Sequence, residues 1–118
     1  MPAPTNSNLQ PLVLYGHRGP GPNPIKVAII LEELKLPWNI VEIQMGPELK
    51  SEPYISFNPN GRLPSLEDPN TGIKLFESGA IIEYLVENYD KEYALHSEDV
   101  QTAWLEKSWL YFQVSGQV

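Results

Sequence analysis

The sequence predicts an α/β domain in which a mixed four-stranded sheet carries helices. Three observations lead to this class. Two short apolar runs flank a segment with helical spacing in the first half of the chain. A strong turn then joins two further apolar runs, and a second segment with helical spacing follows them. The predicted order is therefore βαβ followed by ββα, and an apolar content of 42% over 118 residues is enough for a hydrophobic core.

The first half of the chain predicts a strand, a helix and a second strand. Residues 11–15 (PLVLY) are a short apolar run that is typical of a buried strand. Asn23-Pro24 favours a helix start, because Asn can cap a helix and Pro suits its first turn. Pro37 ends this helix, and residues 38–43 alternate as a second strand. The apolar positions of the helix recur at helical spacing: Val27, Ile30, Leu31 and Leu34. A right-handed parallel crossover is expected.

The second half predicts a hairpin and two helices. Residues 46–61 are expected to form a loop with one short helical turn. The apolar runs at 63–67 and 73–76 flank the turn sequence DPNTG, which predicts an antiparallel hairpin. Ser78 is expected to cap the next helix, which ends near Asn88, and Ser97 to cap a last helix. The core side of the first of these helices carries Ile81, Ile82, Leu85 and Val86.

Composition excludes several classes of function. The net charge of -7 repels phosphate backbones and anionic lipids, so neither nucleic acid nor a membrane is an expected partner. The N-terminal residues lack the basic and apolar regions of a secretory signal, which makes the cytoplasm the expected location. The absence of cysteine excludes disulfides, zinc thiolate sites and catalysis by a protein thiol. His17 and His96 are expected to be surface loop residues rather than metal ligands.

Two stretches carry a family resemblance: NPNGRLPSL at residues 58–66 and FESGAIIEYL at residues 76–85. Together they resemble the N-terminal domain of glutathione transferases, and the resemblance covers residues 12–95. The segment GPNPIKVAI at residues 21–29 is most similar to fungal members related to the prion-forming nitrogen regulator. The resemblance implies a thioredoxin-like fold for the sheet and its helices.

The resemblance also implies a division of the chain. Residues 1–11 would be a flexible tail, 12–89 the glutathione-binding domain and 90–97 a linker. Residues 98–118 would be the first helix of an all-α C-terminal domain that is largely missing. A truncated gene, a genuinely short paralogue and a partial chain each explain this, and truncation is the favoured interpretation.

By the same resemblance, reduced glutathione would be held by residues of both stretches. The Leu63–Pro64 peptide would be cis, so that the Leu63 backbone turns outward and pairs with the cysteinyl part of the ligand. Glu77 and Ser78 would hold the γ-glutamyl end, because helix N-termini attract carboxylates. Lys50 would meet the glycyl carboxylate. The plainer alternatives are a turn proline, a serine N-cap and a solvated surface lysine.

By the same resemblance, Asn23, which matches the Asn of the fungal nitrogen-regulator-like members, is expected to stabilise the glutathione thiolate. Its amide at a helix N-terminus can donate to a thiolate, and such positions lower thiol pKa values. A purely structural N-cap is the alternative. Tyr15, near the end of the first strand, and Arg18, in the following loop, are auxiliary candidates for the same site.

The implied activity is that of a glutathione transferase. The glutathione thiolate would attack an electrophilic small molecule, with glutathione as co-substrate and with no other cofactor and no metal. In fungi such an enzyme serves detoxification or adds sulfur in secondary-metabolite biosynthesis. The alternatives are a non-catalytic glutathione-binding or regulatory module and an inactive remnant. The full-length protein is expected to be a homodimer.

Overall fold

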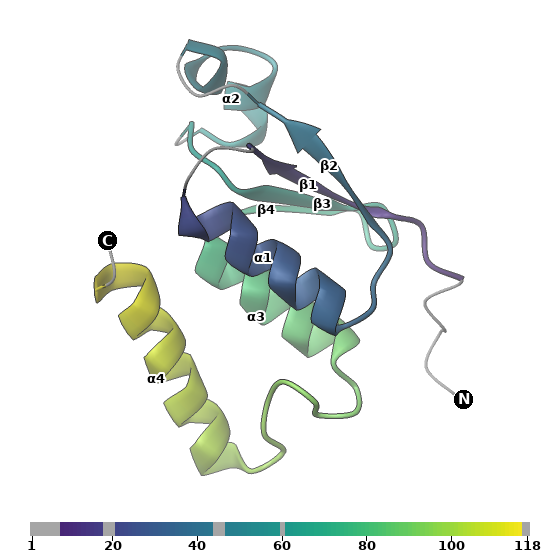
Figure 1. Cartoon of the computed structure of the whole chain (residues 1–118), viewed down its shortest axis with the longest axis vertical. Coiled ribbons are helices and arrows are strands. Elements are labelled where there is room, and N and C mark those ends of the chain that lie inside the picture. The colour runs from purple at the N-terminus through teal and green to yellow at the C-terminus, as the bar shows by residue number, and fades with distance from the viewer. Residues whose placement is uncertain (1–7, 18–20, 44–46, 60, 117–118) are drawn as a thin grey trace.

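The computed structural model of the chain describes residues 8–17, 21–43, 47–59 and 61–116. Four strands form one sheet in the order β2-β1-β3-β4 (Figure 1). β1 pairs parallel with β2 and antiparallel with β3, and β3 pairs antiparallel with β4. The strand bounds are β1 Leu12–Gly16, β2 Trp38–Glu42, β3 Ser65–Asp68 and β4 Ile73–Phe76. The mixed sheet and the thioredoxin-like βαβ-ββα order are therefore as the sequence predicts.

The central strand β1 separates two hydrophobic clusters, because successive side chains of a strand point to opposite faces. Leu12 and Leu14 are almost completely buried and belong to the main core. Tyr15 faces the other side, where it packs against a smaller cluster. The alternation of apolar residues along one short strand thus fixes which face of the sheet carries the large helices.

The main core lies between the sheet and two helices, α1 (Pro22–Glu33) and α3 (Ser78–Tyr89). The two helices lie side by side across one face of the sheet (Figure 1). Each fully buried Leu or Ile contributes about 1.5 to 3 kcal/mol relative to exposure. The helical residues that are completely buried are Val27, Leu31, Ile81 and Leu85, which agrees with the predicted spacing.

The smaller cluster covers one end of the opposite face. Its buried residues are Ile43, Leu49 and Tyr54, and Phe57 and Leu63 pack against them. Two short helical segments supply it, η2 (Pro47–Lys50) and α2 (Tyr54–Phe57). The sequence predicted only one helical turn here. Leu49 and Tyr54 each place one side chain in the cluster, and these contacts stabilise the two turns. The turns are short and otherwise mostly polar, so a search for helical periodicity does not detect them.

The predicted helix caps are wrong at all three helices. Gly21 is the N-cap of α1, so Asn23 lies inside the first turn, and Ser78 is the first residue of α3 after Glu77. No side chain caps either helix. The last helix, α4 (Val100–Gly116), is capped by Asp99, whose Oδ2 accepts hydrogen bonds from the Thr102 N–H and hydroxyl at 2.9 and 2.8 Å.

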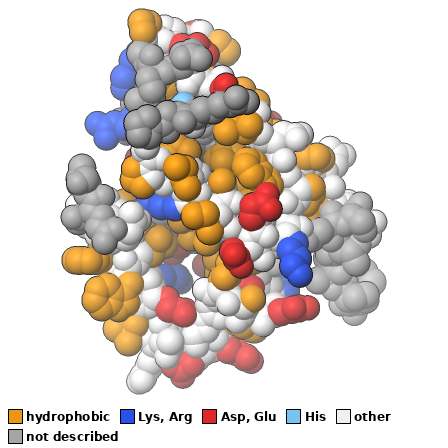
Figure 2. All heavy atoms as spheres, in the orientation of Figure 1, with side chains coloured by type: hydrophobic (Ala, Val, Ile, Leu, Met, Phe, Trp, Pro, Cys, Tyr) orange, Lys and Arg blue, Asp and Glu red, His pale blue; other side chains and the backbone are white. Residues whose placement is uncertain are grey.

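Helix α4 is attached to the sheet domain by polar contacts from its C-terminal half. The Lys26 ammonium on α1 donates to Gln113 Oε1 at 2.5 Å, and the Tyr111 hydroxyl donates to Glu83 on α3. Much of its remaining surface is apolar and exposed, as the orange side chains at the lower left of Figure 2 show. These side chains include Val100, Trp104, Leu105, Trp109 and Phe112. Among the helices that the structure describes, none is long and apolar enough to cross a membrane.

Candidate functional site

A polar pocket of about 230 Å³ forms where the N-termini of α1 and α3 meet the loop that precedes β3. Of the residues proposed from the sequence, five line it: Asn23, Leu63, Pro64, Glu77 and Ser78. Asn58, Arg62 and Val114 complete the lining. Residues from four separate parts of the chain therefore converge on one cavity, which we call the polar pocket.

The N-terminus of α3 gives the polar pocket its anion-binding character. The first α-helical hydrogen bond of α3 runs from the Ile81 N–H to the Glu77 carbonyl at 3.0 Å. The N–H groups of the preceding turn therefore have no helical partner, and the helix dipole favours negative charge beside them. Ser78, the first residue of α3, is buried and lines the pocket beside these N–H groups.

Glu77 has an unusual backbone conformation for a residue with a side chain. Its φ of 73° lies in the region that favours glycine, which costs of the order of 1–3 kcal/mol. Conformations of this kind persist where the surrounding structure requires them, and they cluster at functional sites. The strain holds the Glu77 carboxylate at the pocket, immediately before the helix N-terminus.

A buried network supports the loop that forms the opposite wall. The Asn58 side chain, only 2% exposed, donates to the Arg62 carbonyl at 2.8 Å and to Ser65 Oγ at 3.2 Å. The Tyr54 hydroxyl donates to the same Arg62 carbonyl at 2.5 Å and lies 2.7 Å from Ser65 Oγ. Together these bonds fix the backbone on both sides of Leu63. Neither Asn58 nor Tyr54 was predicted to support the site, although Asn58 begins the motif NPNGRLPSL at residues 58–66.

The peptide between Leu63 and Pro64 is cis, as the resemblance implies. The peptide between Glu52 and Pro53 is also cis, which the sequence analysis did not anticipate. Leu63 and Pro64 both line the polar pocket.

Lys50 lies beside the same loop but does not line the pocket. Gly61, with φ +63°, approaches it so closely that an added Cβ would lie 2.7 Å from Lys50 Cδ and 2.8 Å from the Leu49 carbonyl oxygen. Only glycine fits both this conformation and this spacing. The Lys50 ammonium would lie 3.0 Å from the same point. Its charge is therefore held next to the loop that carries Leu63.

Lys26 adds a cation that the sequence analysis did not select. It lies one helical turn after Asn23 on α1, half-buried. Burial lowers the pKa of the Lys26 ammonium, and the nearby Glu77 carboxylate offsets this only in part. The i, i+3 spacing from Asn23 was the available signal, because residues at that spacing share one side of a helix. Lys26 and Glu77 thus place opposite charges near the N-termini of α1 and α3.

Tyr15, one of the two auxiliary candidates, does not line the polar pocket. Tyr15 lies on the other face of the sheet, where its ring packs 4.8 Å from that of Phe57 and its hydroxyl donates to Glu67 Oε1 at 3.2 Å. Burial, and then the Glu67 carboxylate, raise the pKa of the Tyr15 hydroxyl, which is the opposite of what proton donation to a thiolate needs. Arg18 lies outside the described residues.

Comparison with known proteins places this pocket in a family context. Residues 14–93 match the N-terminal domain of glutathione S-transferases. The chain is 55% identical over 111 residues to the glutathione S-transferase-like protein OpS6 of Beauveria bassiana, an alignment that covers 94% of this chain and 50% of that protein. The chain thus spans about half the length of this relative and of other curated relatives that it matches.

Solved structures give the same result in three dimensions. The glutathione transferase URE2P6 of Phanerochaete chrysosporium, in complex with oxidized glutathione, superposes with a TM-score of 0.81 at 40% identity, covering 96% of this chain and 52% of that one. Ure2p in complex with glutathione superposes with a TM-score of 0.83 at 37% identity, covering 92% and 50%. Ure2p is a yeast prion protein with a nitrogen regulation fragment.

Proposed function

Because the chain belongs to the glutathione S-transferase family, whose N-terminal domain it matches over residues 14–93, we propose that it binds reduced glutathione in the polar pocket. The observation that carries this proposal is the convergence on one cavity of a helix N-terminus, an acidic residue and the loop with the cis Leu63–Pro64 peptide. Glutathione needs these groups because it is an extended tripeptide with two carboxylates and one ammonium.

Each end of glutathione has a matching group in the proposed binding mode. The γ-glutamyl carboxylate accepts hydrogen bonds from the Ser78 hydroxyl and from the first N–H groups of α3. Its ammonium pairs with the Glu77 carboxylate. The cysteinyl backbone pairs with Leu63 beside Pro64 in a short β-like contact. The glycyl carboxylate faces the Lys50 ammonium, which lies beside this loop.

The cysteinyl sulfur then lies towards the N-terminus of α1, where Asn23 lines the pocket. The Asn23 amide and the α1 dipole stabilise the thiolate, so the thiol proton leaves to solvent at neutral pH. The sulfur lone pair forms a bond to an electrophilic carbon, which releases its leaving group or takes up the displaced electron pair. Val114 of α4 also lines the pocket, with its side chain beside Gly79 in the first turn of α3.

Glutathione binding is tested by thermal melting of the chain with and without reduced glutathione. A ligand at about 100 times its Kd adds about 2.7 kcal/mol of stability, so the melting midpoint should rise clearly. Ser78→Ala should weaken affinity by about 10- to 100-fold, because a hydrogen bond to a charged group contributes about 1.5–3 kcal/mol. Ser108→Ala, an exposed serine on α4, is the matched control and should leave the glutathione-induced rise unchanged. A rise that is the same in Ser78→Ala would rule out this binding mode.

The role of Asn23 is tested through the thiol rather than through affinity. We expect thiolate absorbance of bound glutathione to appear one or more pH units below that of free glutathione, whose thiol pKa is about 8.5. Asn23→Ala should move this titration back towards the free value while glutathione still binds. An unchanged titration in Asn23→Ala would leave Asn23 with a structural role only.

A second candidate function is glutathione binding without efficient turnover. It is favoured by the similarity to Ure2p and by the amide, rather than a hydroxyl, at the proposed sulfur site. The two candidates separate in one assay: conjugation of an aromatic halide that proceeds above the uncatalysed rate supports the transferase, whereas binding without conjugation supports the module. Whether a transferase of this kind serves detoxification or biosynthesis depends on the electrophile.

We also propose the domain limits that the family implies. Residues 12–89 would form the glutathione-binding unit, 90–97 the linker and 98–118 the beginning of a helical domain. A homodimer of the longer protein is part of the same proposal, and sedimentation of the chain would test whether these residues alone are sufficient for it.

A further inference from the structure

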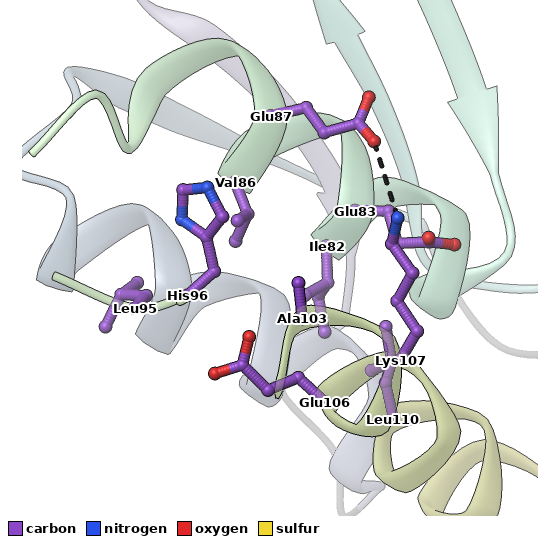
Figure 3. Close-up of a pocket in the computed structure, with 10 residues that line it drawn as sticks. All are labelled: Ile82, Glu83, Val86, Glu87, Leu95, His96, Ala103, Glu106, Lys107 and Leu110. Carbon is purple, nitrogen blue, oxygen red and sulfur yellow. Dashed lines mark ion pairs between the residues drawn. The ribbon is translucent and has the colours of Figure 1, made fainter. Parts of the chain in front are cut away.

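A second cavity, of about 350 Å³, lies between α3 and α4 (Figure 3). We call it the interhelical cavity. Its apolar lining comes from α3, α4 and the segment between them: Ile82, Val86, Leu95, Ala103 and Leu110. Its volume lies within the range of cavities that hold small organic molecules, about 300–1,000 Å³. It shares no lining residue with the polar pocket.

Polar contacts connect α4 to α3 and to the segment between them beside this cavity. The Tyr111 hydroxyl donates to Glu83, and Lys107 Nζ lies 3.9 Å from Glu87 Oε1, so both contacts join α4 to α3. Glu106 Oε1 accepts a hydrogen bond from the Ser97 N–H at 2.9 Å, which joins α4 to the segment before it. The apolar lining of the cavity is therefore flanked by defined polar contacts.

The rim of the interhelical cavity is negatively charged. The carboxylates of Glu83, Glu87 and Glu106 lie around it, and Lys107 is the one lysine or arginine in its lining. Lys107 is already engaged, because its ammonium faces Glu87 and lies 4.4 Å from the centre of the Trp104 ring. The other basic side chain, His96, has its Nδ1 2.6 Å from Asp90 Oδ2. Neither basic group offers an open site to an anion.

We propose that the interhelical cavity binds a small amphipathic organic cation, a molecule with a compact apolar body and one protonated amine. The apolar body occupies the space between Ile82, Ala103 and Leu110, where it is removed from water. The amine lies at the rim, where three carboxylates outnumber one ammonium. Glutathione, with two carboxylates, is disfavoured at this rim, so the cavity complements the polar pocket rather than duplicating it. This inference does not depend on glutathione binding.

The test uses three probes of similar size: 1-naphthylmethylamine, which is cationic, 1-naphthalenemethanol, which is neutral, and 1-naphthaleneacetate, which is anionic. Each is titrated into the ¹⁵N-labelled full chain while amide chemical shifts are followed. The amine should bind about tenfold or more tightly than the other two, which equals about 1.4 kcal/mol. Its shifts should concentrate at residues 82–87, 95–96 and 103–110, and saturating glutathione should not displace it.

Variants separate the charge from the cavity. The double variant Glu83→Gln, Glu106→Gln keeps acceptors for Tyr111 and Ser97 but removes two charges. It should weaken binding of the amine by about 3- to 10-fold. Glu33→Gln with Glu48→Gln removes two exposed charges elsewhere and should change little. Ala103→Leu fills the cavity and should abolish binding of all three probes, with the dispersed amide spectrum confirming that the fold is intact.

Several results would overturn the proposal. Equal affinity for the three probes would show that charge does not select the ligand. Shifts confined to residues 62–64 and 77–78 would place the amine in the polar pocket instead. Absence of saturable binding at millimolar amine, or unaltered binding in Ala103→Leu, would show that the cavity is not a ligand site. Each of these results is independent of whether glutathione raises the melting midpoint.

Discussion

Asp68→Ala is expected to lower the free energy of unfolding by about 3–5 kcal/mol, the largest loss from any polar residue in the domain. Asp68 is completely buried at the end of β3. Its Oδ2 accepts hydrogen bonds from the hydroxyls of Tyr84 and Tyr89, both at 2.5 Å. Its Oδ1 accepts two from Asn70, both at 2.9 Å. Alanine would leave these donors without their acceptor and open a gap between the hairpin and α3.

Urea unfolding measures the loss, and two further variants interpret it. Asp99→Ala removes an exposed carboxylate that caps α4, and it should destabilise the chain less than Asp68→Ala. Combining Asp68→Leu with Tyr84→Phe and Tyr89→Phe removes both sides of the network. Because replacing both partners by apolar groups can be nearly neutral, this triple variant should be more stable than Asp68→Ala. A loss below about 1 kcal/mol for Asp68→Ala would contradict the importance of the network.

The same network predicts a pH dependence of stability. Burial alone would raise the pKa of Asp68, but the hydrogen bonds from Tyr84, Tyr89 and Asn70 outweigh it and hold that pKa below its usual value. A lowered folded-state pKa gives stability that is complete above the unfolded value of about 3.9 and is lost as the pH falls through the folded value. Asp68→Asn should remove this part of the acid sensitivity. Asp90 and Asp99, whose pKa values are also lowered, should retain theirs.

At high pH stability falls as the pH rises, because the group that titrates there is Tyr84. Burial, followed by the bond to Asp68, raises the pKa of Tyr84 to about 12. A raised folded-state pKa gives stability that is complete below the unfolded value of about 10 and is lost as the pH rises through the folded value. The contribution of the network should therefore be constant between about pH 5 and pH 9. Unfolding measured at several pH values across both limits would check this.

Asn58→Ala is expected to cost about 2–3 kcal/mol and to weaken glutathione binding as well. The Asn58 amide donates to the Arg62 carbonyl and to Ser65 Oγ from a fully buried position. Without it, the loop that carries Leu63 and Pro64 loses one of its two supports, and Tyr54 remains as the other. Glutathione must then order this loop when it binds, and the cost of that ordering reduces its affinity. Urea unfolding and calorimetric titration measure the two effects.

Asn88→Ala is the matched control for this second prediction. Asn88 is an exposed asparagine on α3 whose amide donates to the Tyr84 carbonyl at 2.9 Å, and its loss should change stability by no more than about 0.5 kcal/mol. Tyr54→Phe removes the other donor to Arg62, so the double variant with Asn58→Ala should show coupling. If a destabilised Asn58→Ala variant kept full glutathione affinity, the buried network would contribute to stability but not to glutathione binding.

The strands and the two core helices were predictable because their signals are local. Leu12 and Leu14 alternate with half-buried neighbours, and Val27 and Leu31 recur at helical spacing. The DPNTG turn likewise identifies its hairpin without any distant contact. The residues proposed for glutathione came from the family motifs rather than from periodicity. Five of them line one cavity, whereas Lys50 lies beside it and Tyr15 belongs to another face.

The features that sequence reasoning missed depend on contacts between distant segments. Asp68 was predicted only as a turn residue, because its partners Tyr84 and Tyr89 follow much later in the chain. The caps were misplaced because the backbone enters each helix through a positive-φ residue, Gly21 before α1 and Glu77 before α3, which the capping pattern does not reveal. The interhelical cavity is lined by α3, α4 and the segment between them, so no single segment encodes it.

During synthesis, β1 is translated before the other three strands of the sheet, and its partner β3 is translated well after its partner β2. β2 can pair with β1 once residues 38–42 have left the ribosome, whereas β3 follows only with residues 65–68. In the interval β1 presents an open edge, and open edges allow strands of neighbouring nascent chains to join. The time needed to translate residues 43–68 therefore sets how long this edge of β1 stays without its second partner.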